Sequence, residues 1–187
     1  MVDAGQRFPV DCAGTGSQLP FMNSAPAPAE RHSDSAHSNL RASILEHLFV
    51  GELLRFLWAR GERSMQILRS EVDASGHDLV IICNGVTRFI QLKSSRSDAK
   101  TSETTVHVGI AQQRDGCVIW LSFDRQMCLE YLWYGEAPGA ALSLGDKYGR
   151  HTRGSKAERP QTRVLKRSDF TRLTDVAELA QRLFALT

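Results

Sequence analysis

The first strong hydrophobic pattern in the chain predicts a long helix. Residues 40 to 60 place apolar side chains around nearly the whole helical circumference, and Gly61 provides a stop. Such a helix is expected to be buried on all sides. Glu46 and Glu52 then lie among hydrophobic neighbours, where an ionised carboxylate is costly unless it is paired or binds a metal.

Strand-like runs follow this helix. The continuous apolar run 78–83 is typical of a central strand, and 86–93 is a further run of this kind. Asn84-Gly85 lies between them and predicts a two-residue hairpin, because a type I′ turn requires positive φ at both central positions. A strand at 67–73 is expected to precede the hairpin.

The remaining pattern completes a mixed architecture. Residues 94–103 are polar and loop-like, and a second hairpin is expected to join 104–111 to 116–123. A further strand is predicted at 128–134 and a C-terminal helix at 174–185. The fold class is therefore α/β (α+β), a mixed sheet with antiparallel hairpins, flanked by an N-terminal and a C-terminal helix.

Composition separates the first 39 residues from the rest. Ala, Gly, Ser and Pro occupy 18 of these 39 positions, so the segment 1–39 is expected to be a disordered leader to a single domain at 40–187. No secretory signal or membrane-spanning run is recognised. The four cysteines include no C-x-x-C pair, which favours reduced thiols and a cytoplasmic protein.

The predicted hairpin brings candidate chemistry together. A two-residue loop at 84–85 places Asp78 opposite Gln91, and Lys93 lies two residues further on the same face. A carboxylate, an amide oxygen and an ammonium then meet, which suits a hard divalent cation and an activated water. The alternative is that Asp78 shapes a turn while Gln91 and Lys93 form the solvated face of an edge strand.

The helix supplies a further candidate carboxylate. Glu52 falls on the stripe that includes Leu48 and Phe56, so we expect Glu52 rather than Glu46 to point towards Asp78. An arginine of the same helix could instead neutralise either glutamate.

These motifs, in this order, resemble the PD-(D/E)XK nuclease superfamily, and more narrowly its restriction-endonuclease-like and resolvase-like small proteins. The residues that carry the resemblance lie between 46 and 95 and are Gly51-Glu52, Gly61, Gly76-His77-Asp78-Leu79-Val80 and Gln91-Leu92-Lys93-Ser94-Ser95.

The resemblance implies a restriction-endonuclease-like core and a Mg²⁺- or Mn²⁺-dependent endonuclease. Its reaction would be the hydrolysis of phosphodiester bonds in DNA, with defence or DNA repair as the setting. It further implies that Asp78 and Gln91 hold the metal with assistance from Glu52, and that Lys93 is catalytic.

Two positions depart from the superfamily pattern. Gln91 replaces the usual second carboxylate, which removes a negative charge and should weaken metal binding. His77 stands where a proline is usual. The alternative function is therefore a catalytically inactive nuclease-fold protein that serves as a nucleic-acid-binding or regulatory module.

Charge is concentrated late in the chain. Residues 147–167 contain three lysines and five arginines against one acid. A flexible basic loop of this kind can bind phosphate backbones, and the residues expected to contact DNA are Lys147, Arg150, Arg153 and Lys156. The alternative is a solvated loop. DNA is the expected partner, and a homodimer is left open.

Overall fold

The computed structural model describes residues 37–70, 75–150 and 158–186. The chain divides into two units, Met1–Ser38 and Asn39–Thr187, and nearly all the described residues belong to the second. Residues 1–36, which make up most of the expected leader, lie outside the described residues.

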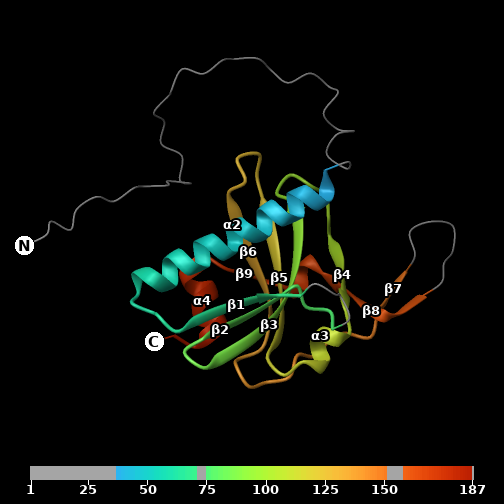
Figure 1. Ribbon diagram of the computed structural model, residues 1–187. Helices are drawn as coiled ribbons and strands as arrows, with labels where there is room; N and C mark the ends of the chain where they lie inside the picture. Colours follow the sequence, from blue (N-terminus) through green and yellow to red (C-terminus); the bar gives the residue numbers. More distant parts are fainter. Residues whose placement is uncertain (1–36, 71–74, 151–157, 187) are drawn as a thin grey trace, which may run out of the picture. The chain divides into compact units, whose positions relative to one another are not determined.

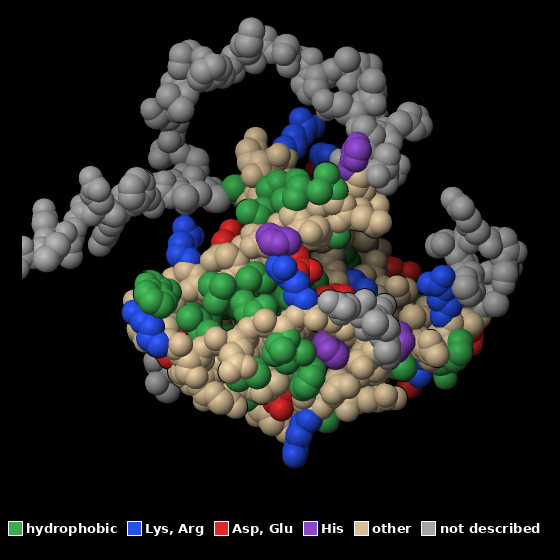
Figure 2. Space-filling model, viewed as in Figure 1, with side chains coloured by type: hydrophobic (Ala, Val, Ile, Leu, Met, Phe, Trp, Pro, Cys, Tyr) green, Lys and Arg blue, Asp and Glu red, His purple; other side chains and the backbone are tan. Residues whose placement is uncertain are grey.

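Helix α2, Ser38–Ala59, confirms the predicted helix but not its burial on all sides. Its buried side chains form one stripe, Leu45, Phe49, Leu53 and Leu57. Hydrophobic side chains remain exposed over α2 (Figure 2), and Trp58 is 61% exposed. The reason is that α2 lies on the surface of this unit, so the sheet covers only one of its faces.

The larger sheet contains the predicted hairpin. Asn84 and Gly85 have φ values of 49° and 82°, as a type I′ turn requires, and Cys83 pairs with Val86. In the described part of the chain this sheet has six strands in the order β1-β2-β3-β5-β6-β9. Neighbours are antiparallel except β3 and β5, which are parallel. The strands are β1 (Met65–Arg69), β2 (Leu79–Cys83), β3 (Val86–Arg96), β5 (Gly116–Phe123), β6 (Leu129–Gly135) and β9 (Thr171–Arg172).

The predicted second hairpin is wrong. Strand β4, Glu103–His107, pairs with β8, Glu158–Lys166, and β8 also pairs with β7, Tyr148–Arg150. The residues of β5 are all buried, and such a strand takes partners on both edges. It lies parallel to β3, which requires the long crossover that begins after β3. The basic segment 147–167 is accordingly not a loop throughout, since it forms β7 and β8.

Each face of the larger sheet is covered by different elements (Figure 1). Helices α2 and α4 (Val176–Phe184) pack on one face and share a core with β2, β3, β5 and β6. The short helix α3 (Gly109–Gln112), β4 and β8 cover the other face around Trp120. A 3-10 turn, η1 (Arg167–Asp169), follows β8. The fold class predicted from the pattern, a mixed sheet flanked by N- and C-terminal helices, is confirmed.

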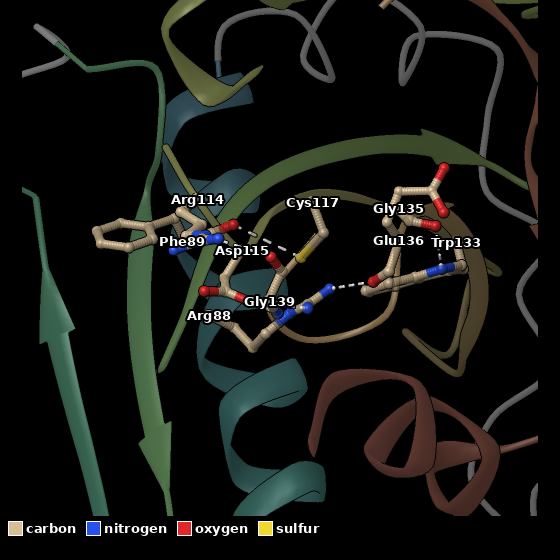
Figure 3. A network of polar contacts seen from close by, with 9 residues as sticks. All are labelled: Arg88, Phe89, Arg114, Asp115, Cys117, Trp133, Gly135, Glu136 and Gly139. Carbon is tan, nitrogen blue, oxygen red and sulfur yellow. Dashed lines mark hydrogen bonds and ion pairs between the residues drawn. The ribbon is translucent and has the colours of Figure 1, made fainter. Parts of the chain in front are cut away.

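Arg88, near the start of β3, is fully buried, and Figure 3 shows its guanidinium beside the carbonyl of Glu136. Its Nη2 donates to the carbonyl of Glu136 at 2.9 Å, and its guanidinium lies 5.3 Å from the ring centre of Trp133. Its Nη1 lies 3.8 Å from Oδ1 of Asp115. Among the described residues, Nε and Nη1 have no hydrogen-bond partner. This cation is therefore held mainly by packing and one strong bond.

Candidate active site

A cavity of about 270 Å³ opens between α2 and the second half of β3. It brings Asp78 and Lys93 from the hairpin together with Glu46 from the helix. The full lining is Ala42, Ser43, Leu45, Glu46, Asp78, Leu92, Lys93, Ser94 and Leu121. Residues separated by up to 79 positions in sequence therefore meet at one site.

Asp78 lies immediately before β2, where the hairpin opens. Leu79 pairs with Ile90, and the N–H of Asp78 donates to the carbonyl of Ile90 at 2.8 Å, so the register places Asp78 opposite Gln91 as predicted. Oδ2 of Asp78 accepts the N–H of Leu92 at 2.6 Å. This bond fixes the carboxylate beside β3, and a carboxylate retains acceptor capacity beyond one such bond.

Lys93 lines the cavity at a point on β3 beyond its described pairing with β2. The pairing between β2 and β3 ends at Leu79 and Ile90, so in the described part of the chain no β2 residue pairs with β3 at Lys93. The four-carbon stem of lysine can lie along the strand and carry its ammonium to the site. Lys93 is half-buried.

Glu46, not Glu52, is the helix carboxylate at this cavity, and our expectation for Glu52 is wrong. Oε1 of Glu46 lies 2.7 Å from Nε of Arg69 at the end of β1, and the side chain is 23% exposed. The ion pair with Arg69 offsets the free-energy cost of desolvating this carboxylate beside the hydrophobic core. It also holds one oxygen in a defined direction while the other remains available.

Glu52 is engaged elsewhere. Its Oε2 accepts the hydroxyl of Tyr131 from β6. At roughly 100° per residue, Glu46 lies about 40° from the centre of the buried stripe of α2, and Glu52 lies about 80° away on the opposite side. The two carboxylates therefore emerge on different sides of the helix, which explains why only one of them lines the cavity.

Gln91 does not join the cavity, contrary to the convergence that we expected. Its side chain is 4% exposed, and Oε1 accepts the N–H of His107 from β4 at 3.0 Å. The amide thus faces the second sheet. His77 also packs inward, with its ring 5.3 Å from that of Phe89, and its buried Nδ1 has no partner among the described residues.

The donor set of the cavity suits a hard divalent cation. The described lining offers the carboxylates of Asp78 and Glu46 and the hydroxyls of Ser43 and Ser94, with no thiol or imidazole among them. Mg²⁺ binds through one or two carboxylates together with waters and substrate phosphate oxygens. No cluster of three or more His, Cys, Asp or Glu side chains placed to hold a metal occurs among the described residues.

Two of the four residues expected to bind DNA, Lys147 and Arg150, belong to the described part of the chain. Lys147 is exposed, and its Nζ lies 2.9 Å from Oε2 of Glu103. Arg150 ends β7. Arg153 and Lys156 lie outside the described residues. The sequence pattern did not point to Arg69, whose contact with Glu46 depends on how α2 packs beside β1.

Comparison with known proteins gives a limited result. No protein-family model matches the chain, and no curated protein matches it. Among solved structures, the chain resembles a bacterial homing endonuclease, I-Ssp6803I, with 18% identity, a TM-score of 0.34 and coverage of 62% of this chain and 81% of that chain. At this TM-score the likeness assigns no activity to the chain. Within the described residues, no helix is long and apolar enough to cross a membrane.

Proposed function

We propose that the protein is a divalent-metal-dependent DNA endonuclease of the PD-(D/E)XK type that hydrolyses phosphodiester bonds. The observation that carries the proposal is the meeting of Asp78, Glu46 and Lys93 in one cavity. Two acids from different elements can hold a metal ion that assists phosphodiester hydrolysis, and a lysine beside them can stabilise negative charge on the phosphate. The N–H of Leu92 orients the carboxylate of Asp78, and Arg69 orients that of Glu46, before any substrate binds.

Each residue of the proposed site would have a role that follows from its side-chain chemistry. Asp78 and Glu46 would hold Mg²⁺ or Mn²⁺, which when bound polarises a phosphate oxygen and makes a coordinated water more acidic. Lys93 would place its ammonium against the phosphate, where it stabilises developing negative charge and orients the attacking water. Arg69 positions Glu46 through their 2.7 Å contact.

A second candidate is a nucleic-acid-binding module without cleavage activity. Gln91 favours it, because this residue replaces the superfamily's second carboxylate and its amide is bound to the backbone of His107. The cavity then depends on Glu46 for its second negative charge. The two candidates differ in whether any metal supports cleavage.

Cleavage of plasmid, single-stranded, duplex and branched DNA, titrated with Mg²⁺ and Mn²⁺, tests the proposal. The native protein should cleave at least one substrate only when metal is added, and Asp78→Asn should not. Asp146→Asn is the matched control, because Asp146 is exposed and outside the cavity. Metal-independent cleavage, or cleavage that survives Asp78→Asn, would contradict the proposal. DNA binding without any cleavage would favour the binding module.

A further inference from the structure

A second hollow lies beyond the end of β3. It is a groove of about 640 Å³ between the connection from β3 to β4 and the turn after β8. Its lining is Ser97, Ala99, Lys100, Thr101, Ser102, Glu103, Lys166, Arg167 and Ser168. Ser94 lines the cavity and Ser97 lines the groove, so both hollows use consecutive stretches of one chain segment.

Two carboxylates near this groove have cationic partners, and a third, that of Asp169, accepts the backbone N–H of Lys166 at 2.8 Å. Glu103 pairs with Lys147 at 2.9 Å. Asp98 accepts hydrogen bonds from the guanidinium of Arg96 at 2.9 and 3.0 Å, and these bonds lower the pKa of Asp98 below its usual value. The negative charges of Glu103 and Asp98 are therefore largely balanced locally.

The cations of the groove are not balanced in this way. Among the described residues, no carboxylate lies within ion-pair distance of the side chains of Lys100, Lys166 or Arg167. Lys166 lies opposite Glu103 in the strand register, but the Glu103 carboxylate is bound to Lys147. The groove thus presents a net positive surface with hydroxyl groups around it.

Arg167 is the most firmly held of these cations. Its Nη2 donates to Oγ of Ser122 at 3.3 Å, and its guanidinium lies 5.4 Å from the ring centre of Trp120. Its backbone N–H donates to the carbonyl of Ser102 at 2.7 Å. A guanidinium has five N–H donors, so one bond to Ser122 leaves donors for a phosphate, which arginine recognises with two parallel bonds.

We propose that this groove binds a backbone phosphate of the DNA substrate at a fixed distance from the bond cleaved in the cavity. From Ser94 to Ser97 an extended chain covers about 10 Å. A DNA strand carries one phosphate per about 3.4 Å along the helix axis. The anchored phosphate should therefore lie within a few phosphates of the scissile one. The inference rests on the proposed nuclease function.

Binding measurements on a non-cleaving protein test the groove separately from the chemistry. In full-length Asp78→Asn protein, Lys100→Gln with Lys166→Gln should weaken duplex binding about tenfold or more and reduce the log–log salt slope by about two. Arg55→Gln with Arg182→Gln removes the same charge from exposed positions on α2 and α4 and should change binding much less. Circular dichroism checks that each variant is folded.

Neutral methylphosphonates placed one at a time along the duplex locate the contact. A methylphosphonate at one position, within a few phosphates of the cleaved bond, should weaken binding to the Asp78→Asn protein but should not further weaken binding to the groove variant. Inorganic phosphate should compete only weakly if the groove recognises a diester within DNA. Cleavage of the same duplex by otherwise native protein supplies the reference bond.

The possible outcomes distinguish failure of the groove proposal from failure of the nuclease proposal. Duplex binding that falls equally in the groove variant and its control would overturn the groove and leave the nuclease proposal intact. Loss of binding in the groove variant, for a protein that cleaves no DNA, would keep the groove and remove the nuclease function. A protein that binds no DNA, or a groove saturated by inorganic phosphate without effect on DNA binding, would also overturn the proposal.

Discussion

The two ends of strand β3 place a positively charged side chain in contrasting surroundings. Near its start, Arg88 is 0% exposed, and its Nη2 bonds to the Glu136 carbonyl at 2.9 Å. Five residues later, Lys93 is half-buried and lines an open cavity with Asp78. The first cation is enclosed by packing, whereas the second faces a hollow where a ligand can enter. Arg88 is therefore a charge enclosed by the fold, and Lys93 is the charge that the proposed function places against the phosphate.

The largest expected effect falls on cleavage. Lys93→Ala should reduce the single-turnover rate on the order of 10³-fold, because it removes charge stabilisation at the phosphate. Arg88→Met should leave that rate within a few-fold of native, since Arg88 lies outside the cavity. Rates from quenched-flow cleavage with saturating metal provide the measurement. Equal losses in both variants would erase the distinction between the two ends of β3.

The free energy of unfolding should show the reverse pattern, with the larger effect at Arg88. Arg88→Ala should lower the free energy of unfolding by about 3 kcal/mol or more, because it leaves a large cavity in a packed region. Arg88→Met fills most of that volume and removes a desolvated cation, so it should remain within about 1 kcal/mol of native. Urea unfolding gives both values. A loss of several kcal/mol in Arg88→Met would mean that the charge itself stabilises the fold.

The two helix glutamates sharpen the comparison within α2. Glu46→Gln should reduce cleavage by about 10- to 100-fold at limiting metal, because it removes a negative charge from the cavity. Glu52→Gln should change cleavage little, since its carboxylate is bound to Tyr131. Metal titrations of the cleavage rate distinguish the two variants. A larger loss with Glu52→Gln would restore our sequence-based expectation.

The smallest effect concerns Cys117, beside Arg88. Burial raises the pKa of its thiol to about 12. The folded protein therefore retains this proton after the unfolded chain has lost it, so the thiol's contribution to stability falls as pH rises above about 9. By pH 10 the free energy of unfolding of the native protein should have fallen by about 1.4 kcal/mol more than that of Cys117→Ala. Unfolding curves at pH 8 and pH 10 test this, and parallel changes in both proteins would contradict it.

Local chemistry explains which parts of the site the sequence could predict. The Asn84-Gly85 turn determines its own register, so the position of Asp78 opposite Gln91 followed from the hairpin alone. The choice between Glu46 and Glu52 depends on how α2 is rotated on the sheet. That rotation is set by packing of the stripe that includes Leu45 and Phe49, which an almost uniformly apolar helix does not reveal.

The remaining differences come from pairing between distant segments. Strand β4 pairs with β8, although more than 50 positions separate Glu103 from Glu158. This pairing brings His107 to Gln91 and turns the amide away from the cavity. No periodicity within either segment specifies its partner, and the apolar run in β5 was equally suited to a local hairpin.

Binding of Mn²⁺, measured by electron paramagnetic resonance of the free ion, tests the central claim most directly. The account predicts that Asp78→Asn and Glu46→Gln each weaken binding about tenfold or more, while Glu52→Gln does not. It also predicts that Gln91→Glu leaves the affinity unchanged, because this side chain faces His107. Native affinity in both Asp78→Asn and Glu46→Gln, or a marked gain in Gln91→Glu, would contradict the assignment of the cavity as the metal site.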